Sequence, residues 1–367
     1  RFAERVRAAQ LATPYAMPAF RAPASAAHLA LNAIPFQAWL DREGLNDPHL
    51  RWYLDYSCRD DYGAGLASVS AWAGIHYFAS RHGFHAPGDD AGEREGVLTW
   101  PEGNAWLTRR MAAPLVEGAG GRLRAGRVVQ RIEAGRQGVT VDAWDAATDT
   151  VERWQAINCI VALPVFVAAR VVVNPPDFLR EAAARTRYSP WLVANLHIER
   201  ALHDRPGAPP SWDNVLYGSA GLGYVDAMHQ NLQRVPGATV LTYYTALGDA
   251  PDARRQLLER PWSHWRDAIV AELSVPHPDL REKLRRMDIT RYGHAMAVPV
   301  PGTLRNGHFQ VRNRLSPASA GHEQLQEYER LTPSEGRLHF AHSDWSGYSV
   351  FEEAFTRGHA AAVSLRA

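Results

Sequence analysis

Residues 337–367 constrain the fold more than any other part of the sequence. Residues 337–341 alternate in polarity like a short β-strand. Residues 349–352 have the Ser-x-x-Glu spacing of a capping box, which predicts that a helix begins at Val350. Apolar residues then recur at three- and four-residue steps, which predicts one buried helix face: Val350, Phe351, Ala354, Phe355, Gly358, Ala361, Ala362 and Leu365. The region is therefore predicted to form a strand, a loop and a helix.

The predicted helix start offers a binding site for a ligand. Its first backbone N–H groups have no acceptor within the helix, which favours an anionic or electron-rich group at that point. Glu352 and Glu353 lie in the same turn and interact favourably with the helix dipole. An ordinary capped helix that packs on a sheet would show the same pattern, so the residues alone leave both interpretations open.

Four short segments of this region follow a recognisable order. They are Ala-His-Ser-Asp at 341–344, Trp-Ser-Gly-Tyr at 345–348, Glu-Ala at 353–354 and Arg-Gly-His-Ala-Ala at 357–361. This order resembles the C-terminal flavin motif of the flavin-containing amine oxidase family, in which an Ala-Gly-Glu/Asp segment leads through a Ser-Gly-Tyr-like turn into a helix. The present copy has His342 where glycine is usual, and two additional residues before the Glu-Ala pair.

The resemblance implies that FAD is the cofactor and that it lies at the predicted helix start. Ser349, Val350 and Phe351 would contact the cofactor. The N–H groups of Val350 and Phe351 would stabilise negative charge at the N1–C2=O edge of the reduced flavin. Asp344 would accept a hydrogen bond from a ribityl hydroxyl, with a loop-capping role as the alternative.

The resemblance also implies an aromatic wall on the substrate side of the flavin. Tyr348 belongs to the turn that carries this aromatic residue in the family, and Tyr292 or His294 would supply the opposite wall. These three are the candidate catalytic residues. An aromatic pair would guide an amine or an apolar substrate, with about 0.5 to 2 kcal/mol for each cation–π contact. The alternative is that Tyr348 fills the core beside the helix.

Three segments in the middle of the chain match the same family in order. Residues 101–104 match a Pro-x-Gly-Gly loop before a helix, residues 129–132 a Val-x-x-Ile strand, and residues 162–164 the end of a strand before proline. The resemblance implies that the first strand contacts the adenine side of FAD by its backbone, and that the second lies beside the nucleotide. The candidate cofactor contacts here are Pro101, Gly103, Val129, Ala162, Leu163 and Pro164. All of them also suit a sheet core.

Residues 165–332 have the composition of a substrate domain. Residues 188–200 and 239–245 are predicted strands, and residues 252–273 are a predicted amphipathic helix. Residues 291–299 resemble a Trp-x-x-Ala-x-Pro segment that reaches toward the flavin in the family. Many members place a lysine near the flavin N5 from the strand that corresponds to 188–199, whereas the only lysine here is Lys283.

The dinucleotide-binding fingerprint that normally opens such a flavoprotein is missing. Segments at 63–68, 118–123 and 221–226 begin as Gly-x-Gly, but none ends in Gly or Ala or clearly connects a strand to a helix. The resemblance covers residues 100–367. We therefore expect the chain to be the C-terminal portion of a longer protein, or half of a split one, with the N-terminal segment or a complementary chain as its partner.

The composition excludes several other classes of protein. With 46% hydrophobic and 22% charged residues and a net charge of +1, the chain fits a globular protein, and nucleic acid is a poor candidate partner. Cys58 and Cys159 are too few for a disulfide framework. His82 and His85 have no carboxylate at a spacing that would complete a metal site, so no metal site is predicted. No apolar run reaches the length of a membrane helix, and no secretory signal is visible, which slightly favours the cytoplasm.

The predicted fold is a mixed α/β fold of the FAD-binding amine oxidase type, incomplete at the N-terminus, with an interleaved substrate domain. Four segments are expected. Residues 1–97 form an arm and the helical part of the substrate domain, 98–175 part of the FAD-binding domain, 176–332 the substrate domain, and 333–367 the last strand and helix of the FAD-binding domain. The helix at Val350 is expected to return to one sheet that holds both Val129 and a continuous strand at 157–163.

The predicted function is that of an FAD-dependent oxidoreductase that takes a hydride from a C–N or C–C bond of a small or apolar substrate. One alternative is a flavoenzyme of the carotenoid desaturase or isomerase type, because the aromatic residues between 191 and 265 would line an apolar cavity. The other is a degenerate flavoprotein half that binds without catalysis. The sequence does not specify the substrate, the electron acceptor or the oligomeric state.

Overall fold

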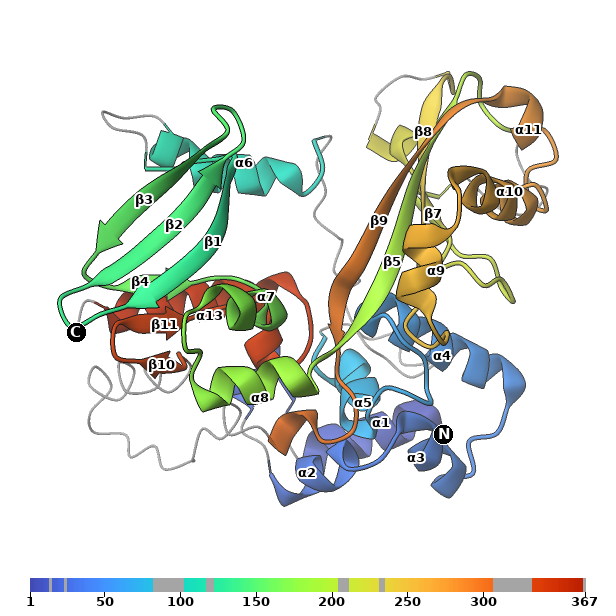
Figure 1. The fold of residues 1–367 in the computed structure, drawn as a ribbon. Coiled ribbons are helices and arrows are strands. Elements are labelled where there is room, and N and C mark those ends of the chain that lie inside the picture. Colours follow the sequence, from blue (N-terminus) through green and yellow to red (C-terminus); the bar gives the residue numbers. More distant parts are fainter. Residues whose placement is uncertain are drawn as a thin grey trace. The chain divides into compact units, whose positions relative to one another are not determined.

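The structure is a computed structural model that describes residues 1–12, 15–22, 25–81, 102–116, 122–203, 211–230, 235–305 and 332–365 (Figure 1). The chain divides into two compact units, each assembled from segments that are far apart in the sequence. The first unit contains residues 1–2, 31–77 and 187–301, and the second contains residues 3–30, 78–186 and 302–367.

A five-stranded antiparallel sheet forms the centre of the first unit (Figure 1). Its order is β6-β7-β8-β5-β9, with β5 at Arg187–Ile198, β6 at Asp213–Asn214, β7 at Tyr224–Asp226, β8 at Thr239–Ala246 and β9 at Leu284–Val298. Alternate residues of β5 are buried because one face of the sheet packs against helices: Leu192, Ala194, Leu196 and Ile198. Strands β5 and β8 confirm the strands predicted from the sequence.

Two helices cover the buried face of this sheet, α9 (Ala253–Glu259) and α10 (Trp262–Leu273), and Leu257 and Leu273 belong to the same core. The single helix predicted over 252–273 is therefore wrong. Pro261 has no backbone N–H to donate, so it ends the first helix and stands at the N-cap of the second.

Other helices complete the first unit: α3 (Phe36–Arg42), α4 (Pro48–Tyr62), most of α5 (Ala71–Ala79), η2 (Ala227–Gln230) and α11 (Leu280–Lys283). The start of α4 is capped by Asp47, whose Oδ1 accepts from the N–H of Leu50 at 2.8 Å. Gly63 ends α4 with φ of +76°, and a Cβ there would stand 2.4 Å from the Cβ of Ser189. Only glycine fits both the backbone and the space.

The second unit contains two small sheets. Strands β1 (Arg127–Ala134), β2 (Val139–Asp145) and β3 (Thr150–Ala156) form an antiparallel meander. Strands β10 (Ser334–Glu335), β11 (Leu338–Phe340) and β4 (Cys159–Val161) form the other sheet, in which β11 runs parallel to β4. The C-terminal segment therefore does return to the strand that holds Ile160.

Two expectations about these sheets are wrong. Val129 lies on β1 in the meander, and not in the sheet that holds Ile160. The apolar run 157–163 contains a strand of only three residues, β4, because Ile157 is 72% exposed and the chain turns into a helix after Pro164.

The helices of the second unit come from all parts of the chain: α1 (Phe2–Ala12), η1 (Ala19–Arg21), α2 (Ala26–Asn32), α6 (Ala105–Val116), α7 (Val165–Val171), α8 (Asp177–Arg185), η3 (Thr303–Arg305), η5 (Ser343–Ser346) and α13 (Phe351–Ser364). The first residue of α1 and the last two of α2 belong to the other unit. No residue of α6 is buried.

Helix α13 differs from its prediction in two ways. It begins at Phe351, and Val350 at its N-cap gives no side-chain cap, so the predicted capping box is wrong. The predicted apolar face is also wrong: of its residues only Ala361 is buried, whereas Phe351 is 58% and Phe355 is 53% exposed. The buried side chains of this helix are instead Glu353, Arg357, Ala360 and Ala361.

No helix in the described part of the chain combines the length and apolar character that crossing a bilayer requires. The same residues contain no group of three or more His, Cys, Asp or Glu side chains that would hold a metal ion.

Lys283 forms a buried ion pair in the first unit. Its Nζ donates to Oδ2 of Asp279 and to the carbonyl of Ala201, each at 2.6 Å, and the two charged side chains are 9% and 7% exposed. Burial alone would raise the pKa of Asp279, but hydrogen bonds from Lys283 and from the N–H of His203 outweigh it, so the pKa is lowered.

We expect Lys283→Met to lower the free energy of unfolding by about 3 kcal/mol, because it leaves a buried carboxylate without its counter-charge. Urea unfolding followed by circular dichroism measures this, with Arg281→Met, at an exposed position, as the matched control. Since the pKa of Asp279 is lowered in the folded protein, its contribution is complete above about pH 4 and is lost as the pH falls further. Equal, small losses in both variants would show that the pair does not stabilise the fold.

Candidate functional site

Two parallel strands end side by side in the second unit. β4 ends at Val161 and β11 at Phe340, and these two residues are paired. The loops that follow, 162–164 and 341–344, therefore leave the sheet at the same edge and carry four predicted cofactor contacts: Ala162, Leu163, Pro164 and Asp344. Ligands of open α/β sheets bind outside the carboxyl ends of the strands, so this edge is the candidate cofactor site.

Asp344 connects the two loops. Its Oδ2 accepts a 3.0 Å hydrogen bond from the N–H of Val165, the first residue of α7, and its side chain is 1% exposed. Nδ1 of His342 accepts from the N–H of Asp344 at 3.1 Å, and the same nitrogen lies 3.2 Å from Oδ1 of Asp344. Asp344 thus caps α7, while its contact with a ribityl hydroxyl stays a prediction.

The start of α13 has the backbone groups that an electron-rich ligand requires. Val350 is extended, with φ of −131° and ψ of 157°, and gives no side-chain cap to the 14-residue helix. The first N–H groups of such a helix have no acceptor within it and lie at the positive end of its dipole. Ser349 and Val350 are half-buried and Phe351 is exposed.

The other predicted cofactor contacts lie elsewhere. Val129 is half-buried on β1, where the register with β2 shifts between Val129 and Arg131. Gly103 is exposed, with φ of +63°, two residues before α6. Pro101 lies outside the described residues. Strand pairing therefore brings residues 162–164 and Asp344 together, but it does not bring Val129 or Gly103 to them.

Tyr348 is 1% exposed, and its hydroxyl donates to Oε1 of Glu353 at 2.7 Å. One turn further along α13, Arg357 donates from Nε to Oγ of Ser346 at 3.1 Å and from Nη2 to the carbonyl of Trp345 at 3.0 Å. The sequence analysis did not identify the two charged residues as buried. Their i,i+4 spacing was the available signal, because it places them on one side of the helix.

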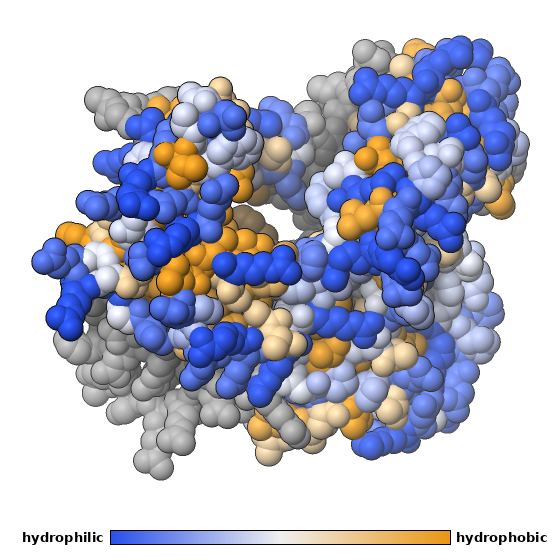
Figure 2. All heavy atoms as spheres, viewed as in Figure 1, coloured by the Kyte–Doolittle hydropathy of each residue, from blue (hydrophilic) through white to orange (hydrophobic). Residues whose placement is uncertain are grey.

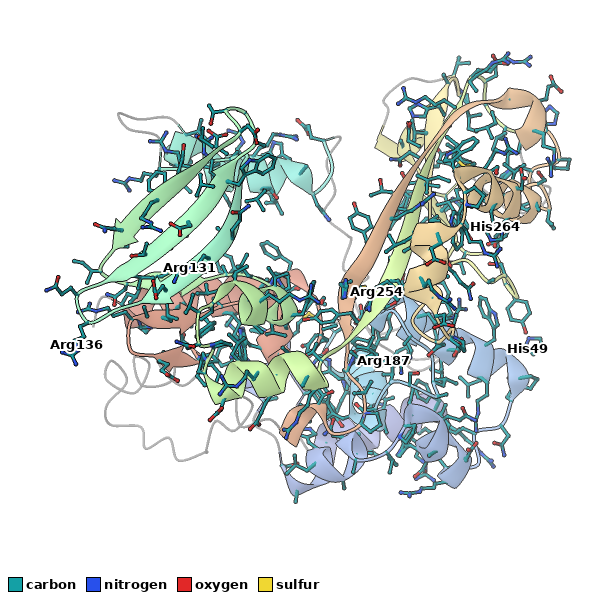
Figure 3. The ribbon with its side chains drawn as sticks, in the orientation of Figure 1. His49, Arg131, Arg136, Arg187, Arg254 and His264 are labelled. Carbon is teal, nitrogen blue, oxygen red and sulfur yellow. The ribbon has the colours of Figure 1, made fainter. Side chains whose placement is uncertain are left out.

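Tyr292 and His294 lie in the first unit, at alternate positions of β9, so their side chains share one face of the strand. Tyr292 is 49% exposed and pairs with Trp191. The His294 ring lies 5.6 Å from the ring of Tyr188 at 70°. Arg254 of α9 donates to the carbonyl of Gly293 between them at 2.6 Å and holds this part of β9 (Figure 3).

The first unit also contains a carboxylate among aromatic rings, which we call the Asp213 cluster: Asp213, Tyr56, Trp191 and Tyr244. Oδ1 of Asp213 accepts from the Tyr244 hydroxyl at 3.4 Å, and the rings of Tyr244 and Trp191 stack at 6.3 Å and 9°. Burial, followed by the negative charges of Asp60 and Asp213, raises the pKa of Tyr56.

The carboxylate of Asp213 has no cationic partner within the described part of the chain. Burial raises its pKa, and no Arg, Lys or His of the described residues forms an ion pair with it. The indole N–H of Trp191 is buried and has no acceptor among the same residues. A half-buried carboxylate beside aromatic faces is the chemistry that binds an organic cation. The sequence analysis identified the aromatic residues but missed Asp213, for which the sequence gives no local signal.

The residues at the β4–β11 edge fit a flavin nucleotide in their chemistry. The start of α13 offers N–H donors, Asp344 offers a carboxylate, and Figure 2 shows apolar residues gathered over α7, which begins at this edge. Cofactor sites combine a mostly apolar lining with a few polar groups of this kind.

Comparisons with known proteins agree with this description. A family model described as flavin containing amine oxidoreductase matches residues 3–366. The structure is similar to cyclohexylamine oxidase from Brevibacterium oxydans IH-35A, with a TM-score of 0.61 and 16% identity over 94% of this chain and 70% of that one. It is also similar to wild-type putrescine oxidase bound to putrescine, with a TM-score of 0.62 and 17% identity over 92% and 69% of the two chains. Curated proteins give no match.

We expect Asp344→Ala to lower the free energy of unfolding by about 1 to 3 kcal/mol, because the N–H of Val165 loses its acceptor in a buried place. Asp344→Asn is the matched control, since its side-chain oxygen still accepts that hydrogen bond. Thermal unfolding of the two variants beside the parent protein measures the difference. Equal losses in both would mean that the negative charge, and not the cap, is what stabilises this edge.

Proposed function

The chain belongs to the family of flavin containing amine oxidoreductases, and from this premise we propose that it oxidises the C–N bond of an amine to C=N, with hydride transfer from the carbon of that bond to FAD. Family membership confirms the fold, the FAD cofactor and the oxidoreductase class that the sequence predicted. The proposal that the substrate is an amine goes beyond family membership, and the Asp213 cluster is the observation that supports it.

The Asp213 cluster supports an amine as substrate. Amines with ordinary basicity are protonated at neutral pH, and the cluster offers one negative charge with the flat faces of Tyr244 and Trp191 beside it. The pKa of Asp213 is raised by burial, and a bound cation would lower it again, so ligand and carboxylate stabilise each other. An apolar substrate would gain nothing from this charge.

The second unit would hold the cofactor at the β4–β11 edge. Residues 162–164 would lie beside the nucleotide, and Asp344 would accept from a ribityl hydroxyl with an oxygen that does not cap α7. The N–H groups at the start of α13 would stabilise negative charge on the reduced ring. When bound, FAD supplies the hydride acceptor, and the protein supplies position and electrostatic field.

The candidate catalytic residues keep their proposed roles as aromatic walls around the substrate. The hydrogen bond of Tyr348 to Glu353 fixes the orientation of its ring, which a wall requires. Tyr292 offers a partly open ring on β9. Two alternatives are kept for the test: oxidation of a C–C bond in an apolar, carotenoid-like substrate, and binding without catalysis.

We expect the purified protein with FAD to show a flavin band near about 450 nm, and an added primary amine to bleach this band without oxygen. Long-chain apolar polyenes are the comparison. Bleaching by a polyene and not by amines would support C–C oxidation, and the absence of any bound flavin would support the binding module.

We expect Asp213→Asn to raise the KM for a cationic amine about tenfold, which corresponds to the loss of about 1.4 kcal/mol of charge-assisted binding. Asp267→Asn, at an exposed carboxylate of α10, is the matched control and should leave the KM unchanged. Steady-state kinetics at constant ionic strength separate the two variants. An unchanged KM in Asp213→Asn would remove the argument for an amine.

A further inference from the structure

One carboxylate in the second unit connects parts of the chain that are 334 residues apart. Oε1 of Glu353 accepts from the backbone N–H of Ala19 at 2.5 Å and from the hydroxyl of Tyr348 at 2.7 Å. All three residues are buried, with exposures of 2% for Glu353, 5% for Ala19 and 1% for Tyr348. A charged acceptor in such a place forms stronger hydrogen bonds than a neutral one, and losing it takes this acceptor from the N–H of Ala19.

Glu353 is unusual for its position. A carboxylate in the first turn of a helix normally faces the free N–H groups of that turn and the positive end of the dipole. Glu352, its neighbour in the sequence, is exposed. Glu353 instead points to the segment that precedes the helix and to residues 15–21, which we call the arm.

Arg357 completes the polar side of α13. Burial lowers the pKa of its guanidinium to about 10, which the nearby charge of Glu353 opposes. Its hydrogen bonds hold Trp345 and Ser346, while Glu353 holds Tyr348. The turn that leads into α13 is therefore fixed at both ends by side chains of the helix, and the arm is fixed by the same carboxylate.

We propose that Glu353 is a positioning residue that docks the arm against the first turn of α13, so that the arm is part of the cofactor site. The proposal rests on the function proposed above, because the N–H groups of this turn are those assigned to the flavin. With the arm undocked or Glu353 removed, the first turn of α13 would lose the contact that holds it, and its N–H groups would no longer be held in place for the flavin. Arm docking and flavin binding would then stabilise each other.

The structure offers a change that removes one donor from the contact. Ala19 is the first residue of η1, and Pro18 before it has φ of −68° and ψ of 151°, which is the conformation that precedes proline. Ala19→Pro therefore suits the backbone while it deletes the N–H that Glu353 accepts. Arg21 is exposed two residues further on, so trypsin cleavage after Arg21 reports whether the arm is docked.

The experiment compares Ala19→Pro, Glu353→Ala and Tyr348→Phe with the parent protein and with Glu352→Gln as the matched control. Trypsin cleavage after Arg21 is followed by mass spectrometry, with and without FAD, and the Kd for FAD is measured by quenching of flavin fluorescence. We expect Ala19→Pro and Glu353→Ala each to speed cleavage and to raise the Kd at least tenfold, and the double variant to exceed neither single one. Glu352→Gln should match the parent, and FAD should protect the arm of the parent.

The outcomes separate the two proposals. Faster cleavage with an unchanged Kd would show that the arm docks independently of the cofactor and would overturn this inference. A parent protein that binds no FAD would overturn the proposed function instead. Unfolding of Glu353→Ala, seen by circular dichroism, leaves Ala19→Pro as the deciding variant, because it keeps the buried carboxylate and its hydrogen bond to Tyr348. Tyr348→Phe should leave cleavage near the parent rate, since the N–H of Ala19 keeps its acceptor.

Discussion

The candidate site depends on the pairing of two three-residue strands. β4 and β11 are 179 residues apart from Cys159 to Leu338, yet they run parallel and end at the same edge. Without this pairing, the loops at 162–164 and 341–344 would not meet, and the N–H of Val165 could not donate to Asp344. Such short strands contribute few hydrogen bonds, so the connection between Asp344 and the start of α7 is needed to hold the edge.

Polar contacts, more than apolar ones, set the orientation of α13. Its aromatic residues Phe351 and Phe355 are more than half exposed, while Glu353 and Arg357 are almost fully buried. Burying two charges is costly unless each finds hydrogen-bond partners, and here the turn before the helix and the arm supply them. The buried charged side chains therefore set how the helix is rotated about its own axis, and its two aromatic side chains stay exposed.

The sequence predicted local structure well where one periodicity dominated. Strands β5 and β8 followed from their alternation, and the flavin motif pointed to the strand, turn and helix at 338–364. It failed where a single residue overrode the pattern, because Pro261 split the helix predicted over 252–273. The pattern of apolar residues could not predict the burial of Glu353, because its partners are a hydroxyl five residues away and a backbone N–H in the arm. Asp213 likewise becomes a candidate only when the sheet brings it beside Tyr244.

The single lysine of the chain has a chemical consequence. Lys283 is buried, and its amine is held by Asp279 and the carbonyl of Ala201, while 39 of the 40 basic residues counted as Lys or Arg are arginine. Oxidation of a C–N bond gives an imine, and water converts an imine into an aldehyde or ketone. Such carbonyl compounds modify accessible lysine amines by forming Schiff bases, whereas a protonated guanidinium is a poor nucleophile. In the proposed amine oxidation, the carbonyl product would therefore meet no accessible lysine amine on these residues.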